Sequence, residues 1–147
     1  MPYEFYLPTK LLYGAGCLSA LGGCALPGRK ALLVTSAGQS AKRHGYLAEW
    51  KSSLPKQECV LSSMTRSRQT RPRQKYGGRG ALPERGCDFV LGLGGGSSID
   101  AAKAISVMAR NPGDYWDYVS GGTGKGKAVP NAPLPVVAVT TTAGTGT

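Results

Sequence analysis

Apolar residues along this chain gather into short continuous runs, which are separated by glycine, proline and polar residues. The clearest runs cover residues 30–35, 88–93 and 134–139. Continuous apolar runs of this length, bounded by turn-forming residues, predict strands that are buried on both faces of a parallel sheet. A shorter and weaker run at residues 58–62 predicts one more strand.

Segments with helical periodicity lie between these runs. Residues 41–54 predict a helix that stops before Pro55, and residues 97–110 predict a second helix that ends at Asn111. Residues 18–26 predict a brief helix. Strands that alternate with helices indicate βαβ units. The sequence therefore predicts an α/β fold, in which an open parallel sheet carries helices on both faces.

The length of 147 residues suits one domain, and the apolar fraction of 41% is close to that of ordinary globular proteins. No apolar run approaches the roughly 18 residues that cross a membrane. The N-terminus lacks the basic and then apolar plan of a signal peptide. The four cysteines form no C-x-x-C pair, so we expect them to be small apolar residues in a reducing compartment. These features predict a cytoplasmic protein with no membrane partner.

The net charge of +10 would suggest nucleic-acid binding if it covered one face of the fold. Residues 60–86 hold seven basic residues and one acid, Glu84, and thus six of the ten net charges. The basic residues are Arg66, Arg68, Arg71, Arg73, Lys75, Arg79 and Arg85. No aromatic pattern or binding motif surrounds them, so a nucleic-acid-binding protein acting through residues 66–79 is the weaker alternative, and we expect no nucleic-acid partner. Residues 63–83 also lose apolar periodicity, which predicts disorder.

A glycine-rich turn joins the strand predicted at residues 88–93 to the following helix. Its backbone can turn sharply and bring N–H groups against a phosphate, which the dipole of the helix N-terminus also favours. Ser97 and Asp100 have the spacing of a capping box, so the Ser97 hydroxyl is expected to cap the helix or to contact phosphate. The candidate cofactor-binding residues here are Gly94, Gly95, Gly96, Ser97, Ser98 and Asp100. The alternative is a structural turn with no ligand.

A second polar segment follows the strand predicted at residues 134–139. It supplies Thr140, Thr141, Thr142 and Thr145 as further cofactor-binding candidates. Ligands of open parallel sheets bind beyond the carboxyl ends of the strands, so both loops are expected to line one crevice. The hydroxyls could reach a ribose, a phosphate or a nicotinamide amide there. The alternative is a plain Gly/Thr loop.

Ser36 is the remaining candidate cofactor-binding residue. It lies where nucleotide-binding sheets usually place an acid that holds the ribose hydroxyls. The absence of this acid, with Lys42 and Arg43 nearby, leaves room for a 2′-phosphate. We therefore expect NAD or NADP as the cofactor. Plain solvent exposure is the simpler explanation of Lys42 and Arg43.

These motifs resemble those of the iron-containing, or group III, alcohol dehydrogenase family. Residues 89–105 are similar to its pyrophosphate loop, and residues 135–147 are similar to its threonine loop on the nicotinamide side. The opening residues 5–16 resemble its N-terminal strand and turn. The resemblance covers residues 3–61 and 84–147, and it implies a Rossmann-like domain that precedes an all-helical domain.

The resemblance implies hydride transfer between an alcohol or aldehyde and NAD(P), so the expected partner is a small-molecule nucleotide. In that family Fe²⁺ or Zn²⁺, held by an aspartate and histidines of the helical domain, polarises the alcohol oxygen. None of these ligands can be assigned before Thr147. We therefore expect residues 1–147 to form the dinucleotide-binding domain alone, without catalytic or metal-ligating residues and without alcohol oxidation.

The resemblance leaves three matters open. Glycerol dehydrogenases and dehydroquinate synthases share the nucleotide domain, so a relative of either remains an alternative. The family is commonly homo-oligomeric. Residues 63–83 depart from the acidic, alanine-rich helix of the family, and this abrupt basic segment between matching flanks suggests a disturbed reading frame.

Overall fold

The structure is a computed structural model of the 147-residue chain. It describes residues 3–4, 6–36, 44–53, 58–64 and 86–142. Residues 65–83, Lys42, Arg43 and Thr145 lie outside the described residues. The predictions of disorder, of a disturbed frame, of nucleic-acid binding and of a 2′-phosphate site therefore stay predictions.

The described elements follow the alternation that the apolar runs predict. In chain order they are the 3-10 helix η1 (Ser19–Gly23), β1 (Lys30–Ser36), α2 (Tyr46–Ser53), β2 (Glu58–Met64), β3 (Phe89–Gly94), α4 (Gly96–Met108), α5 (Tyr115–Tyr118) and β4 (Val136–Thr140).

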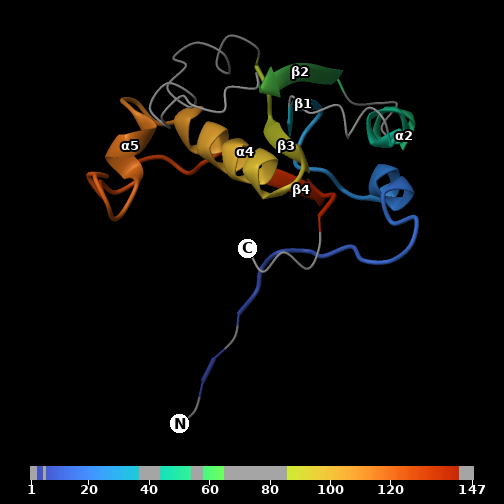
Figure 1. Cartoon of the computed structure of the whole chain (residues 1–147), viewed down its shortest axis with the longest axis horizontal. Helices are drawn as coiled ribbons and strands as arrows, with labels where there is room; N and C mark the ends of the chain where they lie inside the picture. Colours follow the sequence, from blue (N-terminus) through green and yellow to red (C-terminus); the bar gives the residue numbers. More distant parts are fainter. Residues whose placement is uncertain (1–2, 5, 37–43, 54–57, 65–85, 143–147) are drawn as a thin grey trace.

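The four strands form one parallel sheet in the order β2-β1-β3-β4. Figure 1 shows α4 along one face of this sheet, whereas η1 and α2 lie on the other side. The predicted open parallel sheet with helices on both faces is therefore confirmed.

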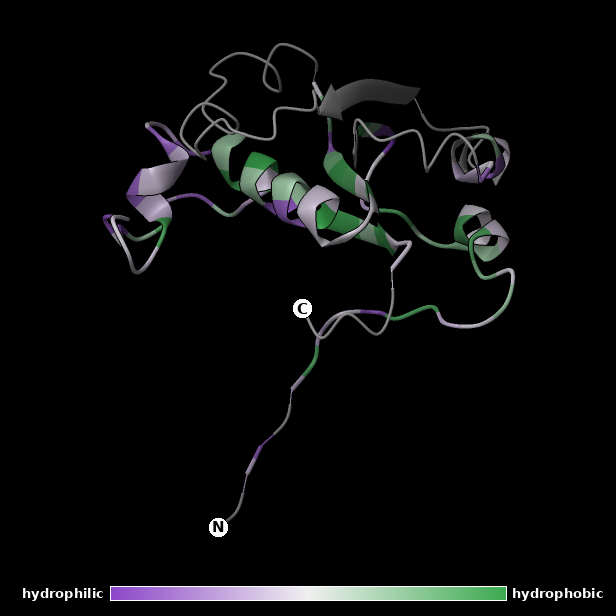
Figure 2. Cartoon of the chain, in the orientation of Figure 1, coloured by the Kyte–Doolittle hydropathy of each residue, from purple (hydrophilic) through white to green (hydrophobic). Residues whose placement is uncertain are grey.

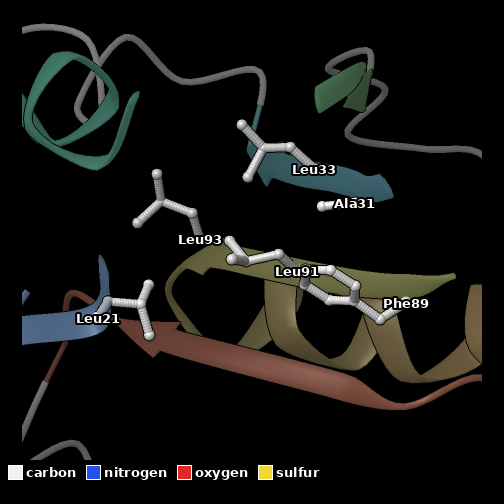
Figure 3. Packing of buried hydrophobic residues seen from close by; sticks show 6 residues of the cluster. All are labelled: Leu21, Ala31, Leu33, Phe89, Leu91 and Leu93. Carbon is white, nitrogen blue, oxygen red and sulfur yellow. The ribbon is translucent and has the colours of Figure 1, made fainter. Parts of the chain in front are cut away.

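The core consists of two apolar clusters, one on each face of the sheet, because successive side chains of a strand point to opposite faces. The cluster under η1 contains Leu21, Ala31, Leu33, Phe89, Leu91 and Leu93 (Figure 3). The cluster under α4 contains Leu32, Val34, Val90, Ala101, Ala102 and Leu134. Every residue of β3 is buried, as its continuous apolar run predicts. Figure 2 shows hydrophobic colouring along β3 and β4, whereas α5 is coloured on the hydrophilic side of the scale.

Several predicted boundaries are wrong by a few residues. The last strand begins at Val136, two residues later than expected, because Pro135 has no N–H to donate to a ladder. Strand β2 continues to Met64, so the irregular segment does not begin at residue 63. The predicted brief helix is the 3-10 helix η1. The N-terminal strand expected from the resemblance is not formed, because no backbone hydrogen bond among the described residues reaches residues 6–13.

The short helix α5 was not predicted, since four residues are too few to show periodicity. Asp114 caps it by accepting a hydrogen bond from the Trp116 N–H at 2.9 Å. The carboxylate of Asp117 lies 2.6 Å from the ammonium of Lys125 and 3.6 Å from that of Lys127. The Lys125 hydrogen bond holds the pKa of Asp117 below its usual value. These contacts fold the loop after α5 back onto this helix.

Asp88 joins the starts of β1 and β3. Its carboxylate accepts hydrogen bonds from the backbone N–H groups of Arg29, at 2.7 Å, and Lys30, at 2.8 Å. The bond from Lys30, followed by that from Arg29, lowers the pKa of Asp88 below 3.8. The ionised carboxylate therefore stabilises the folded state.

This contribution predicts an acid dependence of stability. Because the folded pKa of Asp88 is depressed, its stabilisation is complete above pH 3.8 and is lost as the pH falls from 3.8 through the folded pKa. We expect the urea midpoint of the wild-type chain to fall across this window more steeply than that of Asp88→Asn. Equal pH dependence of the two proteins, measured by circular dichroism, would contradict the assignment.

Candidate nucleotide-binding site

Parallel pairing brings the carboxyl ends of the strands to one edge of the sheet. Gly94 pairs with Thr140, and Thr35, which precedes Ser36, pairs with Leu93. The ends of β1, β3 and β4 are therefore level with one another. The backbone of Ser36 lies at this edge, whereas its side chain lies outside the described part of the structure.

The glycine turn is shaped by contacts that exclude larger residues. Gly94 has φ +141°, a value that side chains rarely permit, and a methyl group there would lie 2.7 Å from Ser98 Oγ. A methyl group added at Gly92, two residues earlier, would lie 3.0 Å from Ala102 Cβ. Both glycines lie on the face of β3 that meets α4, so they allow the helix to pack close to the strand.

Helix α4 begins at Gly96, and Gly95 is its N-cap. The predicted capping box of Ser97 and Asp100 is therefore wrong, because Ser97 already has helical backbone geometry and an N-cap residue does not. Ser97 is exposed, and Asp100 is exposed with its carboxylate 3.9 Å from Lys103 Nζ. Neither side chain caps the helix.

The N-terminus of α4 is suited to an anion. The N–H groups of Gly96 and Ser97 precede the first intrahelical bonds, which Ser98 and Ile99 donate to Gly95 O at 2.9 and 3.3 Å. No described residue accepts a hydrogen bond from Gly96 or Ser97 N–H, and the first turn carries no acid. No described carboxylate in the first turn thus neutralises the positive end of the helix dipole.

The threonine segment lies beside the glycine turn. The N–H of Thr141 donates to Gly94 O at 3.0 Å, which extends the β3–β4 ladder past the end of β4. A methyl group at Gly95 would lie 3.5 Å from Thr142 Cγ2 and 3.7 Å from Thr142 Oγ1. The hydroxyl of Thr140 instead donates to Thr142 O at 2.9 Å and holds the local turn. The structure therefore brings the two predicted loops together, with the side chain of Thr142 beside Gly95.

Ser98 is one of the predicted cofactor-binding residues, but its burial was not predicted. Its side chain is 2% exposed, and its hydroxyl has no hydrogen-bond partner in the described part of the chain. Its position on the sheet-facing side of α4 is the only signal that could have indicated burial.

The described residues do not provide a metal site. Among them, no group of three or more His, Cys, Asp or Glu side chains could hold a metal ion. The described residues therefore do not supply a set of ligands for the iron or zinc that the resemblance implies. No described helix is long and apolar enough to cross a membrane.

Comparisons with known proteins identify the family. A sequence profile described as iron-containing alcohol dehydrogenase matches residues 8–147. The chain is 33% identical over 146 residues to probable NADH-dependent butanol dehydrogenase 1 of Bacillus subtilis, a match that covers 98% of the chain and 36% of the relative. It is 50% identical over 60 residues to a mitochondrial hydroxyacid-oxoacid transhydrogenase of Xenopus tropicalis, across 40% of the chain and 13% of the relative.

Solved structures give the same result. The fold matches that of an archaeal alcohol dehydrogenase from a halo-thermophilic Red Sea brine pool with a TM-score of 0.77 and 32% identity. This match covers 95% of the chain and 36% of the solved chain. Nearly all of the chain is matched, but it spans only about 36% of the length of these two relatives. Because the profile covers nearly the whole sequence, the chain belongs to the iron-containing alcohol dehydrogenase family.

Proposed function

We propose that this chain binds NAD(H) through the diphosphate, at the N-terminus of α4, as the nucleotide-binding part of an alcohol dehydrogenase. The observation that carries the proposal is the pair of N–H groups at Gly96 and Ser97, which have no partner among the described residues. A methyl group at Gly96 would meet no described atom within 4 Å, so the approach to this N–H group is open. A diphosphate would accept hydrogen bonds from these groups. Thr142, which lies over Gly95, would contact the nicotinamide half.

The bound nicotinamide supplies hydride acceptance or donation, and the protein orients it. The proposed reaction of the whole protein is hydride transfer between an alcohol or aldehyde and this cofactor. The relatives named NADH-dependent butanol dehydrogenases support NAD over NADP. NADP remains the second candidate, because β1 ends in Ser36 rather than in an acid.

Titration with NADH and NADPH, followed by fluorescence of the reduced nicotinamide, tests the proposal. We expect saturable binding of NADH with higher affinity than that of NADPH. A chain that is folded by circular dichroism but shows no saturable signal with either cofactor would contradict it.

The lack of alcohol oxidation stays a prediction. Formation of NADH from NAD⁺ and butanol that depends on added Zn²⁺ or Fe²⁺ would contradict that prediction. A cytoplasmic location also stays a prediction.

A further inference from the structure

Ser98 differs from other buried polar side chains of this chain in its lack of a hydrogen-bond partner among the described residues. Ser106, on the same helix, is 3% exposed and its hydroxyl donates to Lys103 O at 2.7 Å. Asn111 is 5% exposed and its amide is bonded to Val107 O and Asn131 O. Ser98 Oγ is equally buried and has no partner among the described residues. A buried hydroxyl without a partner destabilises the folded state, because its hydration is lost and not replaced.

The side chain of Ser98 points toward the N-terminus of α4, where the diphosphate is proposed to bind. Side chains of a helix tilt toward its N-terminus, so a residue in the first turn points toward the groups that open that end. Ser98 Oγ accordingly lies against the turn, 2.7 Å from the point that a methyl group on Gly94 would occupy. The hydroxyl is therefore held directly beneath the turn that follows β3.

We propose that the missing partner of Ser98 is the cofactor: when a diphosphate binds, the glycine turn shifts and the Ser98 hydroxyl donates a hydrogen bond to a diphosphate oxygen. This inference rests on the proposed function. The energetic cost of the unpartnered hydroxyl in the free protein is then removed on binding. Ser98 consequently strengthens cofactor binding at the expense of the stability of the free chain.

This arrangement predicts opposite effects of one substitution on two measurements. Ser98→Ala removes the unpartnered hydroxyl, so we expect the Tm of the free chain to rise by about 4 °C. The same variant lacks the donor, so we expect the Kd for NADH to increase about tenfold. The Ki of inorganic diphosphate, used as a competitor of NADH, should increase by a similar factor. Ser98→Cys keeps the bulk with a weaker donor and should give a smaller increase in Kd.

Ser106→Ala is the matched control, because it removes an equally buried hydroxyl that already has a partner on the same helix. We expect it to leave the Kd unchanged and not to raise the Tm. A Ser98→Ala variant with unchanged Kd, or with a lower Tm than the wild type, would overturn the inference. Failure of the wild-type chain to bind NADH would instead overturn the proposed function, and this inference with it.

Discussion

Phe89→Ala is expected to lower the free energy of unfolding by about 3–5 kcal/mol, the largest loss expected of any single substitution proposed for this chain. Phe89 is fully buried, and it pairs with Ala31 at the start of β3. Alanine beside alanine would leave a cavity that neither strand can fill. Removing a buried phenylalanine costs about 3–5 kcal/mol, whereas a whole domain is stable by only about 5–15 kcal/mol.

Urea unfolding measured by circular dichroism gives the free energy of unfolding of Phe89→Ala. Tyr13→Ala is the matched control, because Tyr13 is an aromatic residue with a fully exposed side chain. Its substitution should change stability by less than about 0.5 kcal/mol. Similar losses in the two variants would show that Phe89 does not lie in the core.

Gly94→Ala weakens the binding of NADH, with an expected increase in Kd of about a hundredfold. The added methyl group meets Ser98 Oγ at 2.7 Å and Ser98 Cβ at 3.2 Å, and φ +141° is strained for alanine. The turn must move to relieve both, and such strain and overpacking cost about 1–3 kcal/mol each. In the displaced turn, the backbone N–H groups of Gly96 and Ser97 would no longer point toward the diphosphate.

The titration of Gly94→Ala needs a control that separates loss of binding from loss of folding. Gly23→Ala, in η1, adds the same methyl group in open space and should preserve both stability and affinity. The double variant Gly94→Ala with Ser98→Ala removes the closer contact but keeps the backbone strain. It should regain part of the stability and none of the affinity. Wild-type affinity in Gly94→Ala would show that this turn does not hold the cofactor.

The apolar runs predicted the sheet well because burial on both faces leaves little choice of residue along a parallel strand. All six residues of β3 are buried, and the predicted run 88–93 differs from it by one residue at each end. The prediction of adjacent loops followed from the same property, since the ends of parallel strands must meet at one edge.

Features that depend on how side chains pack against neighbouring elements were not predictable. Helix α4 begins at Gly96 with Gly95 as its N-cap, so the serine–aspartate spacing wrongly assigned a cap to Ser97. Helix α5 is held partly by the ion pair between Asp117 and Lys125, which are eight positions apart across a turn. The unpartnered hydroxyl of Ser98 arises from packing between helix and strand, which no local pattern records.

The strand order has a consequence for how the chain acquires its structure during synthesis. β1 occupies an inner position, and its pairing with β3 joins Ala31 to Phe89. Folding that relies on contacts so distant along the chain is slow, because a long loop must close before they form. A nascent chain that has emerged only as far as β2 leaves one edge of β1 unpaired until the ribosome has added β3.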